Sequence, residues 1–170
     1  MKIAHALFAA VLPVMAVPVM AQPAAAQSAP PEVLFRSGAD IPALIARAKA
    51  NQESPTINSV VPIVSVAPYL VLLEYRTGVT PPTVHHGQAE LVRVLKGSAD
   101  LATGGHLTGI LPPTSGPGSA SDVGTGIVGA TKRHIVEGDY AMVPPDTAHQ
   151  FQGVKGEFVI MSVHLLMPPK

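Results

Sequence analysis

Two short segments of this chain carry the residue types that bind transition metals. The first holds His85 and His86 followed by Glu90, and the second holds His149. Imidazole nitrogens and a carboxylate oxygen are usual protein ligands for Zn, Fe, Mn or Ni, and such a set leaves positions open for water or substrate. We therefore predict one divalent metal ion on these residues, with its identity open. Glu90 is also the candidate catalytic residue, as a general base if it detaches from the metal.

Strand register decides which of the two adjacent histidines faces the metal. Side chains alternate faces along a strand, so His86 and Glu90 share parity and are expected to point into the same cavity. His85 would then point the other way, unless a bulge at Gly87 resets the alternation. We favour His86 as the ligand and keep His85 as the alternative. His164, in the last apolar run, is either a satisfied core histidine or a cavity-lining group.

The segments around these residues have the pattern of strands. Short runs of β-branched and apolar residues alternate with Gly and Pro turns, and no helical pattern separates them, which predicts an all-β sandwich or barrel. Pro62 predicts that the first strand lies at a sheet edge. Gly104 and Gly105 predict a two-residue hairpin turn. The strands are expected at 60–66, 69–75, 91–95, 99–103, 127–136, 140–143, 149–152 and 158–165.

Two further segments complete the predicted domain. A short helix is expected over 40–50, with Asp40 as its cap and Lys49 at the favourable end of the helix dipole. We expect it to pack on the outside of the barrel. The stretch 112–126 is rich in Pro, Gly and Ser and is expected to be an irregular surface loop, or a lid over the barrel mouth.

The two histidine-bearing segments resemble the paired signature motifs of the cupin superfamily. The first family motif is Gly, five residues, His-x-His, three or four residues, Glu, six residues, Gly. The second is Gly, five residues, Pro-x-Gly, two residues, His, three residues, Asn. The matching positions are Gly78, His86, Glu90, Gly97, Gly138, Pro144 and His149. The resemblance covers roughly 69–165 and implies a cupin-type double-stranded β-helix, that is, a jelly-roll barrel with a short N-terminal helix.

Some positions depart from the family pattern. Val84 stands where the family has its first histidine, and Asp146 stands where it has a turn glycine. The missing histidine leaves three expected protein ligands instead of four. The segment also resembles a cupin subgroup with a single histidine five residues before the acidic position, and in that subgroup His85 would be the ligand.

The first 26 residues are typical of a secretory signal peptide. A positive start at Lys2 precedes an apolar run, and small residues offer cleavage after Ala21 or Ala26. We expect an exported protein, periplasmic or secreted, with no stable membrane span after cleavage. A flexible lead-in would reach about residue 38, and 39–170 would form a single cupin domain. The chain has no cysteine, so disulfides cannot support it.

Composition and motifs exclude several functions. The formal net charge is zero and aromatic residues make up 4% of the chain, so the basic and stacking surfaces of a nucleic-acid binder are missing. The sequence has no G-x-S-x-G, which disfavours a serine hydrolase. We expect a small organic molecule as substrate or ligand, with oxygenase, isomerase or lyase chemistry left open. The alternative is a non-catalytic cupin that binds a small molecule or a metal. A homodimer through edge strands is also expected.

Overall fold

The computed structural model describes residues 32–112 and 121–167. The predicted signal peptide lies outside the described residues, and so does 113–120 of the predicted loop. Among the helices of the described part, none has the length and apolar character needed to cross a membrane.

The described chain starts with helical turns and continues as strands. The 3-10 turn η1 (Gly38–Asp40) leads directly into helix α1 (Ile41–Asn51). The strands, in chain order, are β1 (Ser59–Val66), β2 (Tyr69–Arg76), β3 (Thr83–His85), β4 (Gln88–Lys96), β5 (Ser98–Thr103), β6 (His106–Thr108), β7 (Ser121–Val123), β8 (Gly126–Val128), β9 (Thr131–Val136), β10 (Tyr140–Val143), β11 (His149–Gln152) and β12 (Phe158–Leu166).

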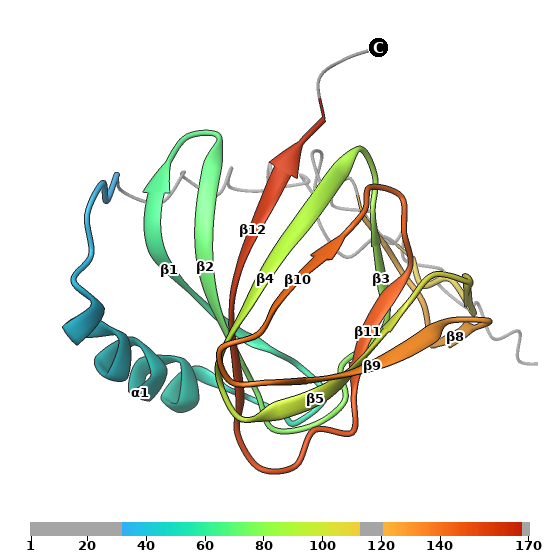
Figure 1. Ribbon diagram of the computed structural model, residues 1–170, viewed down its shortest axis with the longest axis horizontal. Coiled ribbons are helices and arrows are strands. Elements are labelled where there is room, and N and C mark those ends of the chain that lie inside the picture. The colour runs from blue at the N-terminus through green and yellow to red at the C-terminus, as the bar shows by residue number, and fades with distance from the viewer. Residues whose placement is uncertain (1–31, 113–120, 168–170) are drawn as a thin grey trace, which may run out of the picture.

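The strands form two five-stranded sheets whose pairings are antiparallel. One sheet has the order β1-β2-β12-β4-β10 and the other β7-β3-β11-β5-β9, while β6 and β8 form a small two-stranded sheet. Figure 1 shows the two large sheets facing one another as the walls of a barrel, with α1 outside β1 and β2. This is the all-β jelly-roll barrel predicted from the sequence.

Alternate residues of each strand fill the barrel, which has an apolar part and a polar part. Val92 and Val94 of β4 pack with Phe158 and Ile160 of β12 in the main core. Because side chains on one face recur every second residue, the inward face of β4 also includes Glu90, and that of β12 includes Ser162 and His164. The polar part is therefore a continuation of the core strands themselves.

Helix α1 covers the outer face of the first sheet. Leu44 and Ala48 of the helix are buried with Val61, Leu73 and Tyr75 of β1 and β2. The prediction that the helix packs outside the barrel is confirmed. Tyr75 therefore lies on the opposite face of β2 from Glu74, and its side chain supports the helix instead of the cavity.

The start of the helix differs from the prediction. Asp40 makes no capping hydrogen bond, because η1 precedes α1 and gives Asp40 helical dihedral angles. The backbone N–H of Ala39 donates instead to the Ser37 hydroxyl, at 3.2 Å. The capping residue is therefore Ser37, one turn earlier than expected.

Several strand predictions are confirmed and others are wrong. β1 lies at a sheet edge, as Pro62 predicted. The strand expected over 127–136 is divided into β8 and β9, because Gly129 has φ 78° and turns the chain. The turn at Gly104 and Gly105 exists, but β5 pairs with β9 and β11 while β6 pairs with β8, so it joins no hairpin.

Three very short strands, β3, β6 and β7, were not among the expected strands. β3 pairs with β7 through Thr83–Val123, Val84–Asp122 and His85–Ser121. The prediction of an irregular loop over 112–126 is therefore wrong at β7, which is held by a partner distant in the sequence. Three-residue strands carry too little periodicity to be identified without that partner.

The turns of the two motif-bearing segments need a left-handed backbone. Gly97 and Gly138 have φ values of 80° and 92°, which glycine adopts without the usual steric penalty. Asp146, where the family motif has glycine, still has φ 57°. Aspartate is one of the few other residues found in this region, so the turn survives the replacement.

The two motif glycines offer a matched test of what each position requires. A Cβ at Gly138 would meet nothing within 4 Å, whereas a Cβ at Gly97 would lie 2.1 Å from the Glu157 carbonyl oxygen. Gly138→Ala should therefore cost only the backbone penalty, about 1–2 kcal/mol. Gly97→Ala should cost clearly more, since Glu157 must also move. Urea denaturation of both variants measures the difference, and equal losses would contradict it.

Candidate metal centre

The polar part of the barrel encloses a cavity of about 210 Å³. Its walls come from both sheets and from the segment before β3. The lining residues are Asn58, Glu74, Arg76, Thr80, Pro81, Thr83, His85, Glu90, Val123, His149, Gln150 and Phe151.

One carboxylate in this cavity is surrounded by three imidazoles. Glu90 is 3% exposed, and its Oε2 lies 3.0 Å from His149 Nε2 and 3.8 Å from His85 Nε2. Its Oε1 lies 4.0 Å from His164 Nε2. The His85 ring also contacts both other rings, with centroids 5.2 Å from His149 and 4.2 Å from His164. The structure thus brings Glu90, His149 and His85 together and adds His164.

Strand pairing places these four side chains. Glu90 of β4 is directly opposite His164 of β12 in one sheet. In the other sheet, His149 of β11 is opposite Thr83 of β3. Thr83 stands two residues before His85 on β3, so the side chains of Thr83 and His85 share one face of the sheet. The group therefore forms where the inner faces of the two sheets meet, and it requires the native register of both.

His86 lies outside this group. β3 ends at His85 and β4 begins at Gln88, with a turn at Gly87 (φ 66°) between them. Because His86 and Glu90 do not lie on one continuous strand, their equal parity does not place their side chains on the same face. The structure differs from the favoured prediction and places the alternative, His85, beside Glu90.

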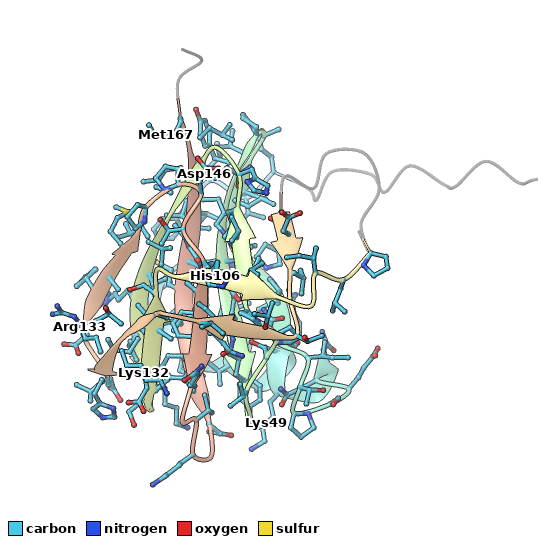
Figure 2. All side chains as sticks on the ribbon, turned by 90° about the vertical axis from the view of Figure 1, so that its right-hand side faces the viewer. Lys49, His106, Lys132, Arg133, Asp146 and Met167 are labelled. Carbon is cyan, nitrogen blue, oxygen red and sulfur yellow. The ribbon has the colours of Figure 1, made fainter. Side chains whose placement is uncertain are left out.

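The side chain of His86 has a different set of partners at the barrel end. It is 50% exposed, and its Nε2 lies 2.9 Å from Asp122 Oδ2 while its Nδ1 lies 3.2 Å from Asp146 Oδ1. The backbone N–H of Asp146 donates to the His85 carbonyl, and that of Met167 donates to the Gly87 carbonyl. Figure 2 shows Asp146 and Met167 at the same end of the barrel. The contacts of His86 with Asp122 and Asp146 therefore stabilise the turn that follows His85.

Hydrogen bonds at the far side of two rings orient them toward Glu90. His85 Nδ1 pairs with Ser121 Oγ at 2.7 Å, and His149 Nδ1 contacts the Thr147 carbonyl oxygen at 3.4 Å. A carbonyl oxygen can only accept, so the His149 contact places a proton on Nδ1. Partners of this kind set the tautomer of metal-binding histidines and leave Nε2 to coordinate. In both residues it is Nε2 that faces Glu90.

The donor set fits a divalent metal ion. Within the described residues, Glu90 Oε2 is buried and has no hydrogen-bond partner, although His149 Nε2 is 3.0 Å away. A carboxylate oxygen and an imidazole lone pair repel one another unless a proton or a metal ion lies between them, and a divalent ion can satisfy all the nitrogens that face Glu90 at once. Ligand atoms of His85, Glu90 and His164 also lie within 4.8 Å of one another, and His149 joins them through Glu90.

The electrostatics of the group give the protonation states that a metal needs. Burial lowers the pKa of His85 to about 4, and the charge of nearby His164 adds to this effect. Burial alone would raise the pKa of Glu90, but the adjacent His149, and then His85 and His164, lower it overall. At neutral pH the His85 lone pair is free and Glu90 is ionised, which are the forms that bind metal ions.

Comparison with solved structures identifies the fold. The chain is similar to the hydroquinone 1,2-dioxygenase PnpCD, solved with Cd²⁺ and 4-hydroxybenzonitrile, with 19% identity and a TM-score of 0.52 over 73% of this chain and 72% of that chain. The chain has the cupin fold.

Weaker likenesses to other solved structures accompany that match. The cupin domain of Cnp3 from Schizosaccharomyces pombe is 9% identical over 64% of each chain, with a TM-score of 0.46. An uncharacterised conserved protein with a double-stranded β-helix domain from Klebsiella pneumoniae is 16% identical over 74% of this chain and 84% of that chain, with a TM-score of 0.47. No protein-family model and no curated protein matches the sequence.

Local sequence patterns hold only partial signals for the other residues in and around the cavity. Glu74 and Arg76 stand two apart in an otherwise apolar strand, which is the spacing of one face, but the pattern cannot say that this face is inward. Ser121 orients His85 from β7, which lay within a predicted loop. Gln150 and Arg76 line the cavity, whereas Arg93 of β4 is exposed and its Cζ lies 5.4 Å from the centre of the Tyr140 ring.

The ligand register can be tested with adjacent alanine variants. His85→Ala should lower metal affinity by at least tenfold, because it removes an imidazole that faces Glu90. His86→Ala should keep the metal content of the wild type, since its ring points toward Asp122 and Asp146. Metal titration of the two purified proteins measures the difference, and a stronger effect of His86→Ala would contradict the assignment.

The low pKa of His85 predicts how the stability of the metal-free protein depends on pH. In the unfolded chain the pKa of His85 has its usual value of about 6.5, whereas in the folded chain burial lowers this pKa to about 4. Between these values the unfolded state holds more protons, so stability should fall as the pH falls from about 6.5 to 4. Glu90 acts in the same direction at lower pH, because its pKa is also lowered on folding.

Urea midpoints of EDTA-treated protein at several pH values measure this dependence. His85→Gln should flatten it, and His106→Gln, which changes an exposed histidine outside the cavity, should not. An identical slope in wild type and His85→Gln would show that His85 does not contribute.

Proposed function

We propose that this chain is an exported small cupin that holds one divalent metal ion on His85, Glu90, His149 and His164 and acts on a small organic molecule. The observation that carries the proposal is the buried Oε2 of Glu90, which faces imidazole nitrogens without a hydrogen bond from any described residue. That arrangement is costly for a protein without a cation and favourable for one with a cation.

The residues of this chain would define what the ion can do. A bound divalent ion supplies Lewis acidity, which polarises a substrate oxygen or acidifies a bound water. His85 and His149 hold their Nε2 atoms toward it through Ser121 and Thr147, so the ring positions are set before substrate enters. The cavity of about 210 Å³ limits the substrate to a small molecule.

A non-catalytic binding role is the second candidate. It is favoured by the hydrogen bonds of Glu74, the other carboxylate of the cavity. Glu74 lines the same cavity but accepts hydrogen bonds from Asn58, Arg76 and Ser162, so it is poorly placed to accept a proton. Among the carboxylates of the described lining residues, Glu90 is then the remaining candidate for a general base. An enzyme built on this site would need Glu90 to leave the metal during the reaction, and a binding protein would not.

We also infer export and self-association for this protein. Export is supported by the N-terminal segment, with its positive start, apolar run and small residues before Ala21 and Ala26. Self-association is supported by edge strand β10, where the Tyr140 and Met142 side chains are 65% and 52% exposed. N-terminal sequencing of the mature protein and its mass by light scattering test these two proposals.

Elemental analysis of the purified protein tests the metal site. The wild type should carry stoichiometric metal after loading with a single divalent ion, while Glu90→Ala and His149→Ala should lose it. A ligand that binds only the folded state at about 100 times its dissociation constant adds about 2.7 kcal/mol of stability, so the melting temperature should rise with metal in the wild type only.

An exposed histidine outside the cavity provides the control. His106→Ala should keep both the metal and the shift in melting temperature, and circular dichroism should show that the two ligand variants remain folded. A wild-type protein that takes up no metal under any loading condition would overturn the metal-dependent function.

A further inference from the structure

The cavity contains a second charged centre, formed by Glu74 and Arg76 of β2. Arg76 Nη2 donates to Glu74 Oε2 at 2.7 Å, and the two side chains are 7% and 8% exposed. An ion pair this deep in a barrel loses the hydration of both charges. Each buried polar atom of the pair therefore needs a hydrogen-bond partner.

The carboxylate of the pair is fully engaged. Glu74 Oε2 accepts from Asn58 Nδ2 at 2.7 Å as well as from Arg76, and Glu74 Oε1 accepts from the Ser162 hydroxyl. Two of these three donors are neutral, so Glu74 does not depend on Arg76 alone for its solvation.

The guanidinium of the pair is not fully engaged. Within the described part of the chain, Arg76 Nε and Nη1 are buried and have no hydrogen-bond partner. A guanidinium has five N–H donors, and these two nitrogens carry three of them. The Phe151 ring lies under the guanidinium, 4.8 Å from Cζ to ring centre, and supplies an attraction to the charge but no in-plane acceptor. Buried donors of this kind normally have a partner.

The position of Arg76 relative to the metal ligands suggests what that partner is. The Phe151 ring contacts both the Arg76 guanidinium and the His149 ring, and the centroids of the Phe151 and His149 rings are 6.4 Å apart. Ser162, which binds Glu74, and His164 are two residues apart on β12, so their side chains are separated by about 7 Å along the strand. A small molecule can therefore reach from the metal ligands to the guanidinium within one cavity.

The charges in the cavity also select the partner. With a divalent ion bound and its three histidine ligands neutral, the ion and Arg76 together carry three positive charges. Glu74 and Glu90 carry two negative charges, so the cavity has a net charge of +1. One negative group balances this excess. A carboxylate balances the guanidinium in charge, and its oxygens accept the charge-assisted hydrogen bonds that a guanidinium donates.

We propose that Arg76 is the anion-recognition residue of the cavity and that the molecule this cupin binds is a small monocarboxylate, its carboxylate on Arg76 and its other end at the metal ligands. The proposal rests on the metal-dependent function proposed above, because the charge balance and the second anchor point both use the ion. Glu74, Asn58 and Ser162 act as positioning residues that hold the guanidinium in place.

The test compares butyrate with butyramide, a neutral molecule of nearly the same shape. Isothermal titration of zinc-loaded wild type at constant ionic strength should show binding of butyrate at least about tenfold tighter than butyramide, as expected for a charge-assisted hydrogen bond in place of a neutral one. Equal affinities would overturn the proposal and indicate that water satisfies Arg76. Tighter binding of inorganic phosphate than of butyrate would overturn the carboxylate assignment.

Arg76→Lys is the informative variant, because it keeps a positive charge beside Glu74 and so preserves folding, but lacks the guanidinium donors. It should lose about tenfold or more of the butyrate affinity while keeping the zinc content and the butyramide affinity of the wild type. The matched control is Arg93→Lys on the exposed face of β4, which should leave all three quantities unchanged. Unchanged butyrate affinity in Arg76→Lys would show that the ion alone binds the carboxylate and would overturn the proposal.

Zinc content measured on the same samples keeps the two proposals separate. Wild type with stoichiometric zinc and no preference for butyrate contradicts the role of Arg76 but leaves the metal-dependent function intact. Wild type without zinc contradicts the metal-dependent function. Without the ion, the charges of the cavity no longer favour a monocarboxylate.

Discussion

The polar part of this protein depends on one contact, the approach of Glu90 Oε2 to His149 Nε2 at 3.0 Å inside the barrel. A neutral His149 protonated on Nδ1 turns the lone pair of Nε2 toward this carboxylate oxygen, so the two atoms repel each other, and burial removes the water that would otherwise screen them. A cation resolves the conflict for Glu90 and for every imidazole around it. The positions of His85 and His149 beside Glu90 are held by the hydrogen bonds with Ser121 and Thr147 and by the turn at His86.

The barrel keeps this polar group stable by building it on the strands of its apolar core. Val92 and Val94 share the inward face of β4 with Glu90, and Phe158 and Ile160 share that of β12 with His164. The packing that stabilises the fold thus also fixes the direction of the ligands. No separate loop needs to be ordered to hold Glu90 or His164, so little additional entropy is lost when a ligand binds.

Much of this arrangement could be predicted from local patterns. The helix and most strands followed from periodicity, and Glu90 and His149 followed from their spacing within the two motifs. The choice between His85 and His86 could not be made in that way, because parity has meaning only along an unbroken strand and the chain turns at Gly87. Strands β3 and β7, and with them the role of Ser121, depend on pairing between segments far apart in the sequence. Whether Glu74 and Arg76 face inward depends on which face of β2 the helix covers.

The Glu74 carboxylate has a consequence for how the barrel assembles. Its three donors come from separate places: Asn58 just before β1, Arg76 on β2 and Ser162 on β12. They converge only when these neighbouring strands have their native alignment. A sheet that slipped by one residue would turn these side chains to the outer face or bury the carboxylate without its donors, and either outcome is penalised. Glu74 therefore favours the native register of these three strands over a slipped one.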